Sequence, residues 1–123
     1  CDTTYAYYEG KKLSEDDIIA EVKKYPARYV CLTGGEPLLQ DASLSLMKRL
    51  CDLGYQVSLE TSGDISCAYV DPRVRKIIDV KTPDSGAPDA FCFENLNLPD
   101  VNSEFKFVIC TERDFTWAEN FVR

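Results

Sequence analysis

The chain of 123 residues contains no histidine. This absence excludes Ser-His-Asp and Cys-His catalysis, and every zinc or copper site that needs a histidine ligand. Any proton transfer must therefore depend on carboxylates, Lys, Tyr, Cys or a cofactor. Long apolar runs are missing as well, since no stretch approaches the ~20 residues of a transmembrane helix. We therefore expect no membrane partner.

Positive charge is scarce. The 14 Lys and Arg residues against 21 Asp and Glu residues give a formal net charge of −7. This balance disfavours broad electrostatic binding to nucleic acid or to an anionic membrane surface. Hydrophobic residues at 45% and charged residues at 28% are ordinary for a globular protein. We expect a single domain over residues 1–123.

The cysteines form no Cys-x-x-Cys pair, and most of them lie in apolar runs. This pattern favours reduced thiols and a cytoplasmic location over a disulfide framework. It also predicts that Cys31, Cys51 and Cys110 are small buried hydrophobic residues. The chain opens on Cys1 rather than on Met, with no signal peptide, so we expect a fragment of a longer protein.

Apolar periodicity predicts strands that alternate with helices along the chain. The expected helices cover 14–25, 44–51, 90–96 and 114–122, and the expected strands cover 28–32, 55–59, 77–80 and 105–109. Strands that recur every ~20–25 residues, with helices between most of them, imply right-handed βαβ units and a parallel sheet. The predicted fold class is α/β.

Polar, glycine-bearing segments follow three of these strands, at 33–37, 60–63 and 81–86. Chemistry gathers at the carboxyl ends of parallel strands, although polar turns are also ordinary there. Gly34 and Gly35 would let backbone groups approach a ligand closely, and Glu36 could hold an ammonium group. Neither phosphate-loop glycine motif is present. This loop therefore favours a ligand with an amino group over a phosphate.

The other two segments each leave two interpretations open. The hydroxyls and carboxylate of 60–63 could bond a ribose, or they could stabilise a plain turn. Asp79 and Lys81 share one face of their strand. They could form an ion pair, or Lys81 could reach a bound carboxylate. Cys1 alone makes no cluster, because iron–sulfur sites need three or four thiolates.

In combination these motifs are more specific. Cys1-Asp2-Thr3-Thr4-Tyr5-Ala6 resembles the end of a radical S-adenosylmethionine cluster loop, and Leu32-Thr33-Gly34-Gly35-Glu36-Pro37 resembles the Gly-Gly-Glu-Pro motif of that superfamily. Together with 60–63, 79–83 and 106–109, they resemble the 7-carboxy-7-deazaguanine synthase family, in the same order across almost the whole chain.

The resemblance implies a truncated, partial parallel (β/α) barrel of the radical S-adenosylmethionine type. It implies a carbon–nitrogen lyase that converts 6-carboxy-5,6,7,8-tetrahydropterin to 7-carboxy-7-deazaguanine with loss of ammonia, in queuosine and deazapurine biosynthesis. The implied cofactors are a [4Fe–4S] cluster, S-adenosylmethionine and Mg²⁺. The implied partners are the pterin substrate, an electron donor such as a flavodoxin, and a second copy in a homodimer.

The resemblance also implies roles for individual residues. Cys1 would be a cluster ligand, Thr3 a magnesium ligand, and Thr33 a contact of the pterin. The implied S-adenosylmethionine pocket consists of Asp2, Gly34, Gly35, Glu36, Ser62, Lys81, Thr82 and Pro83. The first two cluster cysteines of the family have no counterpart here. We therefore expect the 123-residue chain alone to be inactive and free of a cluster.

Two alternatives remain. Another radical enzyme, such as a glycyl-radical activase, shares Gly-Gly-Glu-Pro but acts on a protein. A non-catalytic α/β binding module would carry the same fold, and substitution of Thr33 or Glu36 would then change stability at most.

Overall fold

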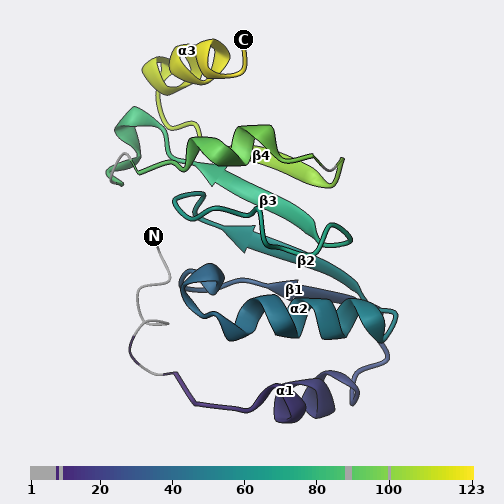
Figure 1. The fold of residues 1–123 in the computed structure, drawn as a ribbon. Helices are drawn as coiled ribbons and strands as arrows, with labels where there is room; N and C mark the ends of the chain where they lie inside the picture. The colour runs from purple at the N-terminus through teal and green to yellow at the C-terminus, as the bar shows by residue number, and fades with distance from the viewer. Residues whose placement is uncertain (1–7, 9, 88–89, 100) are drawn as a thin grey trace.

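Four parallel strands form one sheet. The computed structural model describes residues 8, 10–87, 90–99 and 101–123 (Figure 1). The strands are β1 (Tyr29–Leu32), β2 (Gln56–Thr61), β3 (Arg75–Val80) and β4 (Ser103–Phe107). They lie in sequence order, and each neighbouring pair is parallel. The predicted α/β class with a parallel sheet is confirmed.

Among the described residues the α-helices are α1 (Glu15–Val22), α2 (Ala42–Asp52) and α3 (Glu112–Phe121). Only α2 connects two strands of the sheet. The connection from β2 to β3 is irregular, and the described part of the connection from β3 to β4 holds two 3₁₀ helices, η3 (Pro83–Ser85) and η4 (Phe93–Asn97). The expectation of helices between most strands is therefore wrong. The predicted helix at 90–96 is the short η4, which Pro99 prevents from extending.

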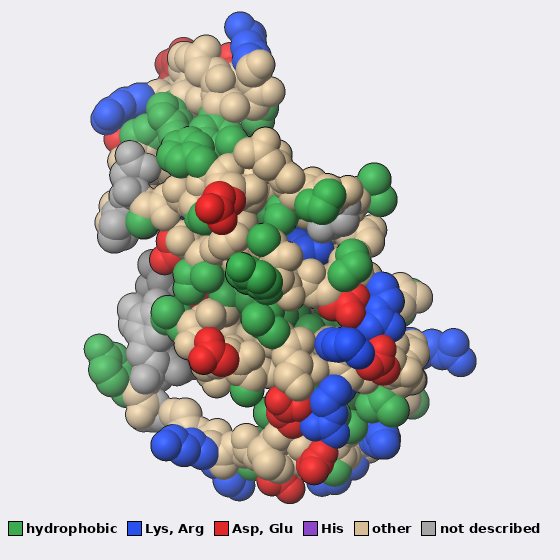
Figure 2. All heavy atoms as spheres, viewed as in Figure 1, with side chains coloured by type: hydrophobic (Ala, Val, Ile, Leu, Met, Phe, Trp, Pro, Cys, Tyr) green, Lys and Arg blue, Asp and Glu red, His purple; other side chains and the backbone are tan. Residues whose placement is uncertain are grey.

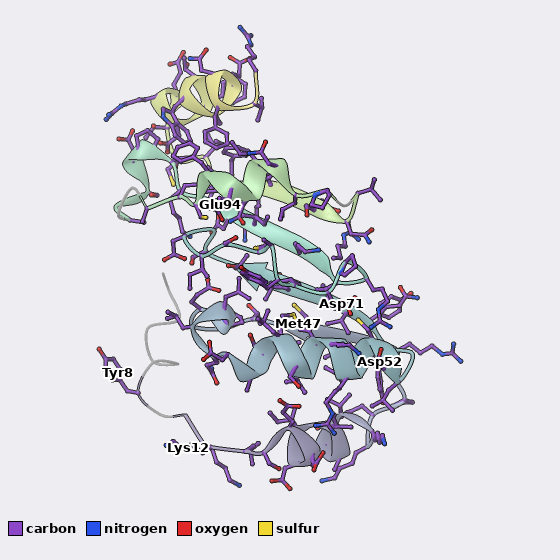
Figure 3. The ribbon with its side chains drawn as sticks, in the orientation of Figure 1. Tyr8, Lys12, Met47, Asp52, Asp71 and Glu94 are labelled. Carbon is purple, nitrogen blue, oxygen red and sulfur yellow. The ribbon has the colours of Figure 1, made fainter. Side chains whose placement is uncertain are left out.

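The hydrophobic core lies on one face of the sheet, beneath α2. Met47 and Leu50 of α2 are fully buried against β2, whose Val57 and Leu59 point to the same face. Figure 3 shows Met47 between α2 and the sheet. Each such aliphatic side chain contributes on the order of 2 kcal/mol when it leaves water. Strand alternation then places Ser58, Glu60, Ile77 and Asp79 on the opposite face.

Aromatic rings attach α3 to the rest of the chain. The Phe121 ring of α3 lies 5.5 Å from both Phe91 and Phe107, and 5.2 Å from Trp117. Figure 2 shows hydrophobic side chains gathered beneath this helix. Since aromatic pairs in edge-to-face geometry add to the free energy of burial, this cluster fixes α3 beside β4 and η4.

The described cysteines are free thiols, but their burial differs from the prediction. Cys31 and Cys110 are exposed and Cys51 is half-buried, so the expectation of burial was wrong for the first two. Cys31 lies on β1 between Val30 and Leu32, which face the core, and it therefore points to the uncovered face. Cys67, on the irregular connection after β2, is the buried cysteine. Within the described residues, no helix has the length and apolar character that crossing a membrane requires.

A charged network fixes the segment that leads into β3. The Arg73 guanidinium donates to Asp71 Oδ2 at 2.8 Å and to Asp52 Oδ1, at the end of α2, at 2.7 Å. Figure 3 shows Asp52 and Asp71 near one another at this end of α2. The hydrogen bonds from Arg73 lower the pKa of Asp71 to about 2. This network joins α2 to the start of β3.

A buried amide joins η4 to the connection after β2. Asn95 is 1% exposed. Its Oδ1 accepts the backbone N–H of Cys67 at 2.8 Å, and its Nδ2 donates to the carbonyl oxygens of Ile65 at 3.0 Å and Gly63 at 3.3 Å. One side chain thus bonds three backbone groups of a segment that lacks regular structure.

The Asp71 carboxyl should make stability sensitive to acid. Its folded pKa is about 2, below the ~3.9 of an unfolded chain. Its contribution to stability is therefore complete above about pH 4 and is lost as pH falls toward 2. Asp71→Asn should unfold more readily at neutral pH and lose less stability between pH 4 and pH 2. Denaturant titrations across that range measure both effects; equal pH slopes for the two proteins would contradict the assignment.

Asn95→Ala should destabilise the fold by about 2 kcal/mol, because it removes the side-chain oxygen that accepts the buried Cys67 N–H. Asn97→Ala is the matched control, since Asn97 is exposed on the same 3₁₀ helix. That change should alter the free energy of unfolding by less than about 0.5 kcal/mol. Urea denaturation of both variants gives the comparison, and equal losses would show that the amide bonds are unimportant.

Candidate functional site

The three polar segments meet at one edge of the sheet. Residues 33–37 follow β1, Ser62 and Gly63 follow β2, and 81–86 follow β3. Because these strands are parallel neighbours, their carboxyl ends lie side by side. The predicted gathering of strand-end loops is confirmed.

Glu36 connects the first two loops. Its Oε1 accepts the Leu38 N–H at 3.0 Å and the Thr61 hydroxyl at 2.9 Å. Its Oε2 accepts the Ser62 N–H at 2.7 Å and the Ser62 hydroxyl at 2.5 Å. The carboxylate caps the 3₁₀ helix η2 (Pro37–Leu39) and bridges the ends of β1 and β2. The hydroxyls that could have bonded a ribose are thus turned toward Glu36.

The glycines beside Glu36 leave the loop backbone accessible. Gly34 has φ +79° and Gly35 has φ +48°, a left-handed conformation that side chains other than glycine rarely adopt. A Cβ placed on Gly34 would meet no atom of the described residues within 4 Å, so these residues leave the space in front of this peptide open. Thr33 and Gly34 are exposed, and Gly35 is half-buried. Backbone groups of this loop can therefore approach a ligand closely.

Lys81 forms an ion pair, the first of its two predicted roles. Its Nζ lies 2.5 Å from Asp79 Oδ2. The second oxygen, Asp79 Oδ1, is buried and has no hydrogen-bond partner among the described residues. Lys106 of β4 occupies the register position beside Asp79, on the same face of the sheet. A carboxylate with two lysines beside it thus marks the end of β3.

Thr82 and Pro83 belong to a loop that is held by α3. Thr82 is 3% exposed, and its hydroxyl donates to the Val108 carbonyl at 3.0 Å. The buried Asp114 of α3 accepts the backbone N–H groups of Asp84 and Cys110, at 2.9 and 3.1 Å. Burial, the largest single effect, raises the Asp114 pKa, but these hydrogen bonds outweigh it and hold the pKa below its usual value.

Cys1, Asp2 and Thr3 lie outside the described residues. Within the described part of the chain, no three His, Cys, Asp or Glu side chains are grouped in a way that could hold a metal ion. The predicted cluster ligand and magnesium ligand therefore stay predictions.

Sequence reasoning missed two contributors to this edge and the partner of a third. Thr61, whose hydroxyl was expected to bond a ribose or stabilise a turn, is buried and bonds Glu36, Asp64 contacts the Ser62 hydroxyl, and Asp114 anchors the loop after β3. The Thr111-to-Asp114 spacing at the start of a helix was an available signal for the last of these, since Thr111 caps α3.

No family model matches the chain. Among curated proteins, the 7-carboxy-7-deazaguanine synthase of Koribacter versatilis is 46% identical over 100% of this chain and 55% of that protein. The synthase of Chlorobaculum tepidum is 43% identical over 99% of this chain and 57% of its own length. The synthase of Thermoplasma acidophilum is 35% identical over 99% and 59%. By sequence, the chain belongs to the 7-carboxy-7-deazaguanine synthase family.

The fold agrees with this family assignment. The crystal structure of QueE from Escherichia coli matches with a TM-score of 0.71 at 25% identity, over 89% of this chain and 47% of that one. The chain spans about half the length of the 7-carboxy-7-deazaguanine synthases that it matches. The matched half includes the Gly-Gly-Glu loop and the segments after β2 and β3.

Gly63 should be intolerant of any side chain, because it brings the end of β2 against β3. It has φ +80°, and a Cβ there would lie 2.8 Å from the Asp79 carbonyl oxygen. Gly54 has φ +88° but open space around it, which makes Gly54→Ala the matched control. Left-handed strain alone costs about 1–2 kcal/mol. Gly63→Ala should cost more than Gly54→Ala by thermal and urea unfolding; equal losses would mean that the close approach is unimportant.

Proposed function

We propose that the protein that carries this chain converts 6-carboxy-5,6,7,8-tetrahydropterin to 7-carboxy-7-deazaguanine, with loss of ammonia, by radical S-adenosylmethionine chemistry. Similarity to 7-carboxy-7-deazaguanine synthases over the whole chain supports the reaction. The observation that carries the proposal at residue level is the bridge from Glu36 to Ser62, which unites the Gly-Gly-Glu loop with the segment after β2.

The strand-end residues suit the methionine end of S-adenosylmethionine. The exposed backbone at Gly34 can face its amino and carboxylate groups, with Gly35 next to it. The hydrogen bonds of Glu36 hold Ser62 next to the same loop. In this proposal Asp2, Lys81 and Pro83 complete the pocket, the buried Thr82 supports it from behind, and Thr33 contacts the pterin. When bound to a reduced cluster, this cofactor supplies the radical that abstracts hydrogen from the substrate.

In this proposal the residues of the chain bind and orient the cofactor and the substrate. The loop at 33–36 would set the position of the cofactor's amino acid end, while the face of the sheet with Asp79, Lys81 and Lys106 offers both charge signs to a pterin with a carboxylate. The described residues provide no cluster site, so the cluster would depend on Cys1 and on further ligands outside them. Thr3 would hold Mg²⁺.

The remaining parts of the proposal depend on the resemblance. Loss of ammonia during ring contraction would make the protein a carbon–nitrogen lyase. Reductive cleavage of S-adenosylmethionine requires an electron donor, for which a flavodoxin is suited. A homodimer and a cytoplasmic location complete the proposal, and the 123-residue chain alone should be inactive.

The test uses the whole protein, reconstituted anaerobically with iron and sulfide. With S-adenosylmethionine, a reductant and the pterin, mass spectrometry should detect 7-carboxy-7-deazaguanine. Cys1→Ala should abolish the product. Cys51→Ala, on α2 away from the strand-end loops, should retain it and is the matched control.

Two other outcomes would contradict the proposal. Release of 5′-deoxyadenosine without the deazaguanine would point to a radical enzyme that acts on another substrate, such as a glycyl-radical activase. Absence of any cofactor cleavage by a cluster-loaded protein would indicate a non-catalytic binding module.

A further inference from the structure

The carboxylate of Glu36 is already occupied by donors of the chain. An ionised carboxylate accepts about four hydrogen bonds. Glu36 receives the N–H groups of Leu38 and Ser62 and the hydroxyls of Thr61 and Ser62, all at 2.5–3.0 Å. The Thr61 hydroxyl also lies 3.0 Å from the second oxygen, Oε2. A ligand ammonium would have to displace one of these donors.

Thr61 cannot touch a ligand from its place in the fold. It is the last residue of β2, it is 4% exposed, and its side chain shares the core-facing side of the strand with Val57 and Leu59. Its hydroxyl donates to Glu36, and the weak bond from the Gly63 N–H at 3.4 Å is its other contact in this loop. Any effect of Thr61 on ligand binding must therefore pass through these contacts.

Ser62 depends on Glu36 for its orientation. Its hydroxyl lies between the carboxylates of Glu36 and Asp64, yet it has one proton and can donate to only one of them at a time. The Ser62 N–H has no such alternative and bonds Glu36 at 2.7 Å. The bond from the Ser62 N–H to Glu36 thus fixes the backbone from which the Ser62 side chain extends. Asp64, the alternative acceptor of the Ser62 hydroxyl, is exposed to solvent.

We propose that Thr61 and Glu36 are positioning residues: Thr61 holds the Glu36 carboxylate, and Glu36 holds Ser62 and the glycine loop in the arrangement that receives S-adenosylmethionine, without itself binding the ligand's ammonium group. This inference rests on the proposed function for the identity of the ligand. It assigns to the Glu36 side chain a role different from the ammonium contact that the motif suggested.

A double-mutant cycle tests the proposal on the whole, cluster-loaded protein. Equilibrium dialysis with labelled S-adenosylmethionine measures the dissociation constant of wild type, Thr61→Val, Glu36→Gln and the double variant. Glu36→Gln places an amide N–H₂ against at least one chain donor. Each single change should weaken binding about tenfold, and the double variant should be no weaker than the worse single one, because both changes break the same link.

Two further variants separate positioning from general loss of structure. Thr61→Ser keeps the hydroxyl and should retain wild-type affinity. Thr116→Val makes the same change as Thr61→Val at an exposed position on α3 and should have no effect. Hydrogen exchange of a peptide that covers Ser62 should be faster in both Thr61→Val and Glu36→Gln. Thr61→Val removes a donor that holds the Glu36 carboxylate in place, and Glu36→Gln replaces one of its acceptor oxygens, so each change weakens the bond from the Ser62 N–H.

Several results would overturn the inference. Wild-type affinity in Thr61→Val, or losses in the two single variants that add in the double variant, would show that Thr61 does not act on ligand binding through Glu36. Unchanged exchange at Ser62 would do the same. If wild type binds and cleaves S-adenosylmethionine but forms no deazaguanine, the proposed substrate fails while the cycle still decides the roles of Thr61 and Glu36. No binding by wild type would overturn both proposals.

Discussion

Parallel pairing of the four strands determines where every polar loop of the chain lies. Since all neighbouring strands point the same way, the segments after β1, β2 and β3 reach one edge whatever connects the strands. The burial of α2 on β1 and β2 then fixes which face is apolar. The site needs no helix after β2, because the irregular connection is held by other means, among them the buried amide of Asn95.

At this edge the polar side chains bond mainly to one another. Glu36 holds Thr61 and Ser62, Asp79 holds Lys81, and Asp114 holds the loop after β3. In the glycine loop, the backbone of Gly34 and the side chain of Thr33 stay exposed. A motif rich in carboxylates and hydroxyls can therefore owe its composition to the rigidity of the loops as much as to ligand contacts.

The sequence predicted the strands, their parallel arrangement and the loops at their ends, because apolar periodicity and glycine placement are local signals. It could not predict that Cys31 would be exposed, since burial on β1 depends on which face α2 covers. It left two roles open for Lys81, an ion pair with Asp79 or a contact with a bound carboxylate. The positions of the side chains decide between them, and the sequence does not give those positions. Nor could it predict that the Glu36 carboxylate is fully hydrogen-bonded within the chain. The donors Thr61 and Ser62 are 25 and 26 residues away in the sequence, and only the fold brings them to Glu36.

The bridge from Glu36 to Ser62 closes a single β1–α2–β2 unit, residues 29–62, and requires nothing from β3, β4 or α3. Closing a short loop costs less conformational entropy than pairing distant segments, and chains rich in local contacts form their structure sooner. During synthesis this unit leaves the ribosome before β4 and α3 have been made. The hydrogen bonds between Glu36 and Ser62 would then form early in folding. β3 and β4 would pair afterwards with a β1–α2–β2 unit whose strand-end loops are already in place.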